Sequence, residues 1–472
     1  MNLSASPWIP VRHLDGSPSL LSLNELFQQA ENIRDLSVNP QERIALTRLL
    51  ICLTQAACGF PEDSNDWPDT HWNLATTVPA YLKKWQDHFQ LLGKGPRFLQ
   101  RELPSSEKPY PLDQINFLRA TGNSPTVLDH RLNDLRTPEA DTALDLLVYQ
   151  NFFIGGMMAS KVKGNGPALK SLHTFIQDKT LAATIRANCL DEESLLTPTG
   201  RPIWEIPEDA ENATRTYLGR LVPLPCRVWL EEDLSGIRIA QGFQAPELID
   251  FARESSNSLI VGYDDKLRIL RAQPERGLWR DLTALTIGRR ATESESAAPP
   301  ILQSHKEEYL TSGHIPLWSG ELIKAVDAKI LDSTESSFQL PQALFSETGR
   351  TRYDQGVKYA EIWSGKARKA AFAYGKALLV DKPDTAATLR HFWHTLDQQA
   401  HLLLETVQQP PIDPLWQDPW HTLVRQAAYN AYRAACPAGA AHSRNLLAHA
   451  AGLRAFKPSS KKIAKKATTP SS

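Results

Sequence analysis

The sequence has no long apolar run and few cysteines, and these absences exclude several classes of protein. No stretch of about eighteen apolar residues occurs, so we expect no transmembrane helix. The first residues, MNLSASPWIPVRHLDG, have no basic start followed by an apolar core, so we expect no export. The five cysteines form no CxxC pair and are odd in number, which argues against a disulfide framework and a structural zinc site. A reducing cytoplasm is the expected compartment.

Common catalytic signatures are missing as well. No HExxH or GxSxG motif occurs, and no cysteine lies in the context of a nucleophile. The stretch GNGPALKS (164–171) is loosely similar to a phosphate-binding loop, but Leu169 stands where such a loop needs glycine. Asp129 and His130 are adjacent on an expected extended segment, so their side chains would point to opposite faces. The sequence therefore favours binding over catalysis and implies no cofactor.

One spacing leaves a metal site open as an alternative. His394, Asp397 and His401 recur at i, i+3 and i+7 beside the apolar side of an expected helix, a pattern that can hold a divalent cation. The simpler interpretation is the polar flank of a packed helix. Two alternative functions follow from the residues alone: a metal-dependent hydrolase at these three side chains, and a helical scaffold protein without a nucleic-acid role.

The charge is divided unequally along the chain. Although the formal net charge is −1, residues 352–472 carry 17 Lys and Arg against 8 Asp and Glu, whereas residues 1–351 carry 35 against 45. A basic C-terminal third is typical of a surface that contacts nucleic acid or an acidic partner. Five of its lysines lie in KPSSKKIAKKATTPSS (457–472), which we expect to be a disordered, solvated tail.

The periodicity of apolar residues predicts an α+β fold with two domains and a tail. Helices are expected over 23–30, 41–57 and 80–92, and strand-like segments rich in β-branched residues follow between 218 and 272. From about residue 350, four amphipathic segments separated by Pro, Gly and Asp predict a four-helix bundle. We therefore expect a large mixed domain of antiparallel strands and helices over 1–348, a four-helix bundle over 349–456 and a basic tail over 457–472.

Six segments in series resemble those of one family. They are NLSASPWIPV (2–11), RIALTRLLICLTQAA (43–57), YLKKWQDHFQLLGKGPRFLQ (81–100), GNSPTVLDHR (122–131), YQNFFIGG (149–156) and HFWHTLDQQAHLLLETV (391–407). Their order and spacing are similar to those of the CasA family, the large subunit of the type I-E CRISPR surveillance complex Cascade. No single segment is decisive, but the series extends over about 400 residues.

The resemblance implies a non-catalytic subunit at the crRNA 5′ end that binds target double-stranded DNA. Such a subunit inspects the protospacer-adjacent motif (PAM) from the minor groove, promotes strand opening and R-loop formation, and offers a docking surface to a separate helicase-nuclease in antiviral defence. Its other partners would be the backbone, crRNA-end-binding and small subunits of Cascade. Because pairing with the guide RNA reads the target, the protein itself reads only a short duplex and tips a nearly balanced strand exchange.

The resemblance places the minor-groove contact in two clusters of glycines and cations. A groove about 6 Å wide cannot admit a helix, but it can admit a backbone without side chains. Either cluster could approach the bases, and the residues that suit this task are Gly155, Gly156, Lys161, Lys163, Gly164, Asn165 and Gly166. The family also uses a lysine on a strand, and the matching strand KLRILRA offers Lys266 or Arg268. The alternatives are a surface loop of turn-forming residues and a solvated strand edge.

In the family, a short hairpin carries a glutamine that wedges beneath the PAM and splits the first base pair. The matching stretch here is GELIKAVDAKI (320–330), in which Asp327 stands where glutamine is usual. A carboxylate is repelled by phosphate and cannot donate a hydrogen bond, so it is a poor substitute. Either Lys324 or Lys329 compensates, or the register shifts, or this protein opens DNA in another way.

The resemblance implies three further features. The family's long loop toward the crRNA end and neighbouring subunits matches a segment with Asn123, Thr126 and His130, for which an ordinary turn is the alternative. The first helix of the expected bundle would line a path for DNA, or be a solvated face, with Lys358, Lys366, Arg368 and Lys369. Family members often carry a cysteine cluster in the strand region, but only Cys226 occurs there, so no metal is expected.

Overall fold

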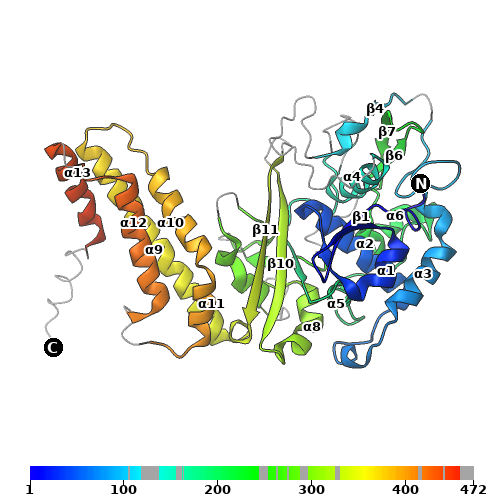
Figure 1. Ribbon diagram of the computed structural model, residues 1–472, viewed down its shortest axis with the longest axis horizontal. Helices are drawn as coiled ribbons and strands as arrows, with labels where there is room; N and C mark the ends of the chain where they lie inside the picture. Colours follow the sequence, from blue (N-terminus) through cyan, green and yellow to red (C-terminus); the bar gives the residue numbers. More distant parts are fainter. Residues whose placement is uncertain are drawn as a thin grey trace. The chain divides into compact units, whose positions relative to one another are not determined.

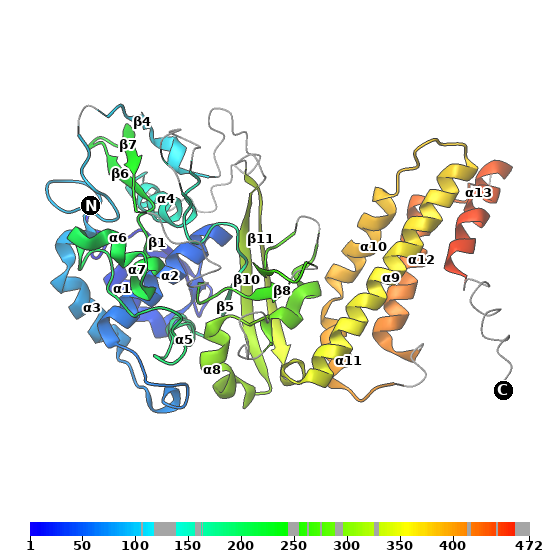
Figure 2. The ribbon, with the colours of Figure 1, turned by 180° about the vertical axis from the view of Figure 1, so that it is seen from behind.

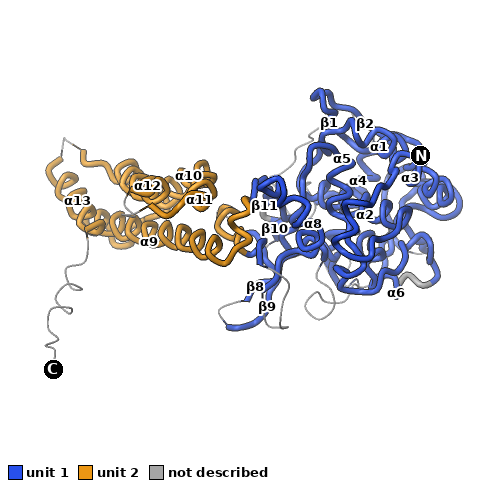
Figure 3. Tube along the Cα trace, turned by 90° about the horizontal axis from the view of Figure 1, so that it is seen from below, with its two compact units in different colours: residues 1–274, 284–340 blue, residues 275–283, 341–472 orange. Residues whose placement is uncertain are grey.

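The computed structural model describes the chain as two compact units. Residues outside the description are 105–106, 118–137, 156–161, 163, 244–253, 262–263, 274–275, 288–295, 325–329, 413–416, 440–441 and 458–472. Unit 1 comprises residues 1–274 and 284–340, and unit 2 comprises residues 275–283 and 341–472 (Figure 3). Residues 275–283, which precede the last strands of unit 1 in the sequence, therefore belong to the helical unit.

Helix α2 (Pro40–Cys58) forms the centre of unit 1. Asn39 begins it with a capping box, in which the Asn39 side chain accepts from the Glu42 amide and the Glu42 side chain accepts from the Asn39 amide. Pro40 occupies the first turn, where no amide donor is needed, and Gly59 ends the helix with a φ of 85°. Most of the helix is buried, and four other helices and one strand pack against it.

The remaining helices of unit 1 surround α2 (Figures 1 and 2). In its described part they are α1 (Leu23–Gln29), α3 (Leu74–Lys84), α4 (Pro138–Phe152), α5 (Leu181–Ala187), α6 (Ala210–Ala213), α7 (Tyr217–Leu221) and α8 (Pro300–Leu310). The contacts with α2 come from α3, α4, α5 and α7. Helix α4 is buried along most of its length, which fixes the point where the chain leaves it at Phe152.

The strands of unit 1 form small antiparallel sheets. Their bounds are β1 (Ile9–His13), β2 (Pro18–Leu21), β3 (Ile33–Leu36), β4 (Tyr110–Pro111), β5 (His173–Ile176), β6 (Cys226–Leu230), β7 (Gly236–Gln241), β8 (Leu259–Val261), β9 (Leu267–Ile269), β10 (His314–Lys324) and β11 (Ile330–Pro341). The sheet orders are β2-β1-β3, β11-β10-β5, β4-β7-β6 and β8-β9. In β6, buried residues alternate with the half-exposed Arg227 and Trp229, as in a strand with one face on the core.

Unit 2 is built on the long helix α9 (Glu347–Ala377), which packs with its other helices (Figure 1). These are α10 (Ala386–Gln398), α11 (His401–Gln408), α12 (Pro419–Ala435) and α13 (Ser443–Leu453). Small residues allow close approach: a Cβ added to Gly356 would lie 2.4 Å from Leu403 Cδ1, and one added to Gly452 would lie 2.1 Å from Tyr432 Oη. The packing of this unit therefore depends on the absence of side-chain atoms at these positions.

The predicted α+β class is confirmed as mixed helices with small antiparallel sheets. Two expected helices differ from the observed ones. The helix expected over 80–92 is α3, which begins earlier and is followed by a 3-10 turn over Gln86–Phe89, and the expected second helix of the bundle is divided into α10 and α11. None of the described helices combines the length and the apolar character that crossing a membrane requires. All five cysteines are free thiols.

Candidate nucleic-acid interface

The predicted contact residues divide between described and undescribed parts of the chain. Outside the described residues lie Asn123, Thr126, His130, Gly156, Lys161, Lys163, Asp327 and Lys329. Within the description are Gly155, Gly164, Asn165, Gly166, Lys266, Arg268 and Lys324 in unit 1, and Lys358, Lys366, Arg368 and Lys369 in unit 2. The candidate interface is therefore defined by the elements that hold the two ends of each undescribed segment.

Both ends of the predicted glycine loop are held at the end of helix α4. Ile154 and Asn165 form an isolated antiparallel bridge just beyond that helix, so the chain leaves and returns at one point. Asn165 is exposed, whereas Gly155 and Gly164 are half-buried. Gly164 has a φ of 94°, a conformation that glycine adopts without a steric penalty. The bridge therefore closes the base of the loop.

Gly166 is required by the packing of this base. Its amide donates to the Phe153 carbonyl oxygen at 2.8 Å, and a Cβ added to it would lie 2.2 Å from the carbonyl oxygen of Asn151. That oxygen belongs to the backbone of α4, which cannot move aside as a flexible side chain can. The fold therefore demands glycine at this buried position independently of any contact with DNA.

A buried charge network lies beneath the same base. Arg48 of α2 donates from Nε to Asn151 Oδ1 at 2.8 Å and from Nη1 to Glu254 Oε2 at 2.5 Å. Arg220 donates from Nε and Nη2 to Glu254 Oε1 at 3.0 and 2.6 Å. The exposed side-chain fractions are 1% for Arg48, 3% for Glu254 and 4% for Arg220. Charges so deeply buried are tolerated only when they are paired, and here each one is.

The network also fixes protonation states around it. Burial alone would raise the pKa of Glu254, but attraction by Arg48 and Arg220 outweighs burial and holds this pKa below its usual value. Burial, reinforced by the charge of Arg48, lowers the pKa of His173 to about 4. His173 is therefore neutral at pH 7, and its Nε2 lies 3.0 Å from the carbonyl oxygen of Ala168, just after the loop.

Strand β5, which lies beside β10 in Figure 2, is close to three segments that the sequence predicts separately. Strand β5 follows the glycine loop and pairs with β10, the first strand of the predicted wedge hairpin. The Leu172 amide donates to the carbonyl oxygen of Leu270, directly after the lysine strand β9, at 2.9 Å. The Ala272 amide in turn donates to Glu321 Oε2 on β10 at 2.5 Å. Hydrogen bonds therefore connect the segment that follows the predicted glycine loop with the residues after β9 and with the first strand of the predicted wedge hairpin.

The two cations at the lysine strand differ in whether a carboxylate pairs with them. Lys266 is exposed and lies one residue before β9, and no described residue pairs with it. Arg268 is also exposed but donates from Nη2 to Asp264 Oδ2 at 2.9 Å. Such a surface pair is weak and is screened by salt, yet it must break before Arg268 binds phosphate. Lys266 therefore fits the predicted role better than Arg268.

Glu321 is a buried acid on β10, the first strand of the predicted wedge hairpin. Burial raises its pKa to about 7, although the Ala272 amide and the Arg271 guanidinium at 3.3 Å oppose this shift. Its carboxyl group therefore changes charge near neutral pH. Lys324, at the end of the same strand, is half-buried.

In unit 2, the predicted cations lie along α9. Lys358 and Lys369 are exposed and about three turns apart, so they share one side of the helix. Arg368 is exposed as well. Lys366 is half-buried, with its Nζ 4.0 Å from the centre of the Trp363 ring, and burial lowers the pKa of Lys366. The helix thus presents mostly exposed cations.

The residues of the alternative metal site are not gathered into one site. Helix α10 ends before His401, which begins α11, so the three residues do not lie on one continuous helix. Asp397 accepts a hydrogen bond from Trp279 Nε1 at 2.7 Å, and His394 contacts Gln398 at 3.0 Å. No cluster of three or more His, Cys, Asp or Glu in the described part of the chain could hold a metal ion. This geometry gives the hydrolase alternative no support.

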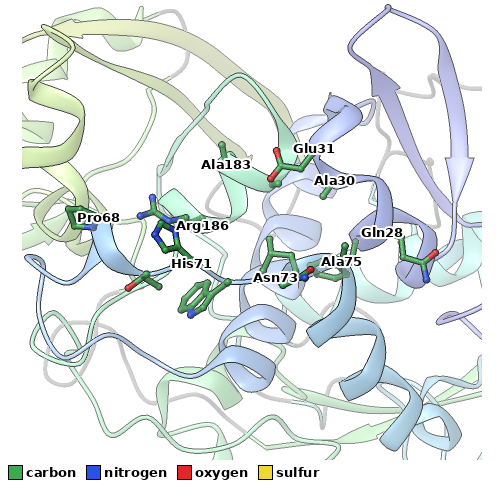
Figure 4. Close-up of a pocket in the computed structure, with 14 residues that line it drawn as sticks. Gln28, Ala30, Glu31, Pro68, His71, Asn73, Ala75, Ala183 and Arg186 are labelled. Atoms are coloured by element: carbon green, nitrogen blue, oxygen red, sulfur yellow. The ribbon is translucent and has the colours of Figure 1, made fainter.

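Unit 1 has a cavity of about 640 Å³ between α1, the segment before α3, and α5 (Figure 4). Arg186 is the one lysine or arginine among its described lining residues. It donates to Glu308 Oε1 at 2.9 Å and to the carbonyl oxygen of Trp67. Because this cation is satisfied by the protein itself, the described lining has no free positive charge to offer to phosphate. A second cavity, beside residues 93–102, is lined by Arg101, which has no carboxylate partner among the described residues.

Reasoning from the sequence missed the buried network, although one signal was present. Arg48 is the one charged residue within the apolar stretch IALTRLLICL (44–53), where a charge must find a partner. The partner could not be identified, because Glu254 lies 206 residues away along the chain. The glycine-rich segments were recognisable because they are local, whereas the charges that hold them are not.

Comparisons with known proteins agree with this architecture. The sequence model of the family described as CRISPR-associated protein Cse1 matches residues 2–431. The CRISPR-associated protein CasA/Cse1 of Thermus thermophilus is 26% identical over 497 residues, which cover 96% of each chain. A crystal structure of CasA from Thermus thermophilus has a TM-score of 0.78 at 23% identity and covers 97% of this chain and 98% of that one.

Two further solved structures show the same fold. Cse1 from Acidimicrobium ferrooxidans has a TM-score of 0.73 at 20% identity, over 99% of this chain and 98% of that one. A chain of a CRISPR RNA-guided surveillance complex has a TM-score of 0.73 at 18% identity, over 97% of this chain and 99% of that one. The likeness therefore extends over both units.

Proposed function

We propose, from the premise that this chain belongs to the Cse1 family of CRISPR-associated proteins, also called CasA, that it is the large subunit of a type I-E crRNA-guided surveillance complex. In this proposal the subunit is non-catalytic and recognises the PAM in duplex DNA from the minor groove. It promotes strand opening and R-loop formation, and it offers the docking surface for the helicase-nuclease in antiviral defence. The helices of unit 2 serve as the four-helix bundle of the family.

The observation that carries this proposal is the set of hydrogen bonds beside β5. A minor-groove reader needs a slender backbone loop, a cation for phosphate and a wedge in a fixed arrangement, because each must reach its own part of one short duplex. Here the loop, the strand with Lys266 and the stem of the hairpin are joined through Leu172, Leu270, Ala272 and Glu321.

The proposed roles of the loop residues depend on how the two ends of the loop are held. The bridge between Ile154 and Asn165 and the packing of Gly166 fix both ends of the loop, and Lys161 and Lys163 lie between these ends in the sequence. In this proposal Gly155, Gly156 and Gly164 give the backbone its narrow profile, and Asn165 supplies a polar side chain at the rim.

The wedge and the RNA contact complete the proposal. Strands β10 and β11 flank the segment with Asp327 and Lys329, as the stem of a hairpin must. Asn123, Thr126 and His130 contact the crRNA 5′ end or the adjoining Cascade subunits. Lys358, Lys366, Arg368 and Lys369 of α9 line the path of the DNA.

The test is salt-dependent binding of PAM-containing duplex DNA to the assembled complex. Replacing Lys161 and Lys163 together by alanine removes two cations, and the slope of log affinity against log salt should fall by about 2. Replacing the exposed Lys83 and Lys84 of α3 by alanine changes the net charge equally and should leave the slope unchanged. Equal slopes for the loop variant and the natural protein would remove the loop from the interface.

A further inference from the structure

Arg101 is a partly buried arginine for which the described residues supply no counter-charge. Its Nη1 donates to the carbonyl oxygen of Gln100 at 3.0 Å, and its buried Nη2 has no hydrogen-bond partner among them. Burial lowers the pKa of Arg101, and no described carboxylate opposes this shift. Other strongly buried arginines of unit 1 have carboxylate partners, among them Arg48, Arg220 and Arg97. A half-buried guanidinium without a counter-charge has a donor available for an external anion.

Arg101 lines a surface cavity of about 770 Å³. Lys94 also lines it and is exposed. His88 lines the cavity too, and burial together with the charge of Arg101 lowers the pKa of His88. This electrostatic effect indicates that the His88 imidazole lies near the guanidinium of Arg101. Gly93 and Gly95, both with positive φ, leave the rim of the cavity free of side chains.

An aromatic ring forms another wall of this cavity. Trp229 lies on the half-exposed face of strand β6, and the guanidinium carbon of Arg97 is 3.9 Å from its ring centre. Arg97 is held in place by the carbonyl oxygens of Gly93 and Leu230 and by Glu232. Arg97 covers one face of the Trp229 ring and orders it, and the part of the ring that lines the cavity offers an aromatic surface to a planar ligand.

The acidic residues of the cavity limit what can enter. Glu102, Glu208 and Glu232 are exposed lining residues, and Glu232 is already paired with Arg97. None of the three forms an ion pair with Arg101, yet together they would repel a long run of phosphates. The cavity therefore suits one phosphate and one planar group, and not an extended duplex backbone.

We propose that this cavity binds a single nucleotide of a nucleic-acid strand, with its phosphate on Arg101 and its base against Trp229. Arginine presents parallel N–H donors that match the oxygens of a phosphate, and an aromatic ring stacks on any base. The site is distinct from the glycine loop and does not depend on the function proposed for that loop. RNA and DNA share the chemistry that it recognises.

The test uses the full chain and short 5′-phosphorylated oligonucleotides, one of RNA and one of DNA, with binding followed by fluorescence anisotropy. Arg101→Gln should weaken binding by about tenfold or more, because it removes the phosphate partner but keeps a polar side chain. Trp229→Leu should weaken binding of both oligonucleotides and leave competition by inorganic phosphate unchanged. Lys84→Gln, an exposed cation outside the cavity, is the matched control and should have no effect.

Each outcome decides the proposal. Loss of binding in both cavity variants, with either RNA or DNA bound more tightly, supports it and identifies the strand. Binding of inorganic phosphate without binding of either oligonucleotide, or unchanged binding in Arg101→Gln, overturns it. If Arg101→Gln does not fold, Arg101→Lys replaces it. This variant keeps the positive charge but loses the paired N–H donors, so it should also weaken oligonucleotide binding. Duplex binding through the glycine loop should keep its salt slope in all these variants, which separates the two sites.

Discussion

The two units keep their charges in different places. Unit 1 buries a paired network of Arg48, Glu254 and Arg220 below its glycine loop, whereas unit 2 holds cations such as Lys358 and Lys369 on the surface of α9. A buried pair has fixed distances and directions, while an exposed cation acts through a field that tolerates displacement. Unit 1 therefore fixes the base of the predicted loop by buried, directed pairs, whereas unit 2 carries exposed cations on α9.

The largest effect should follow from breaking the buried network. Glu254→Gln leaves Arg48 and Arg220 without a full counter-charge, so the free energy of unfolding should fall by about 3–5 kcal/mol. Urea denaturation measures this loss. Glu308→Gln is the control, because Glu308 pairs with Arg186 at the surface with exposed side-chain fractions of 35% and 24%, and it should cost less than about 1 kcal/mol. Equal losses in the two variants would contradict the distinction between buried and exposed charge.

The second effect concerns the helix packing of unit 2. In Gly452→Ala, the new Cβ would collide with Tyr432 Oη, which is buried and donates to the carbonyl oxygen of His449. The free energy of unfolding should fall by about 1–3 kcal/mol. Gly365→Ala, on α9, meets no atom within 4 Å and should raise stability by about 0.5–1 kcal/mol through helix propensity. Thermal and urea unfolding of both variants measure the contrast, and matching signs would refute it.

Features that depend on local sequence could be predicted, whereas features that depend on contacts between distant residues could not. Apolar periodicity predicts α2 because its signal is local, and the structure confirms this helix. The glycine and lysine clusters are also local signals, and the loop that they indicate remains a prediction. The start of α3 was missed, since Pro79 resembles a helix breaker. The helix instead begins at Leu74 and buries Leu74, Val78 and Leu82. Packing against α1 outweighs the local cost of the proline.

The pairings within unit 1 could not be predicted for a related reason. Arg48 and Glu254, or Leu172 and Leu270, meet only once the whole unit has folded. No repeat or spacing in the sequence indicates which of these distant residues come into contact. Similarly, the break between α10 and α11 falls within one amphipathic stretch whose apolar pattern continues through it.

A smaller effect should appear in the pH dependence of unit 1. The pKa of Glu321 is raised by burial to about 7 in the folded state, above its usual value of 4.5. The folded state therefore binds this proton more tightly, and the resulting stability is fully present below pH 4.5 and is lost as pH rises through 7. Glu321→Gln keeps an uncharged acceptor for the Ala272 amide. Between pH 5 and 8 the natural protein should lose about 2 kcal/mol relative to this variant in urea titrations, and parallel curves would contradict the assignment.

The smallest effect should come from the exposed cations of α9. Replacing Lys358 and Lys369 together by alanine removes two diffuse charges, so duplex affinity should fall a few-fold at low salt, and the difference should vanish as salt is raised. Fluorescence anisotropy with the assembled complex measures this fall. Because such cations act through the phosphate backbone, PAM and non-PAM duplexes should be affected equally, whereas Lys161→Ala with Lys163→Ala acts beside the groove contact. If the α9 variant instead loses discrimination between PAM and non-PAM duplexes, α9 takes part in reading the motif, and the division between a precise unit 1 and a diffuse unit 2 fails.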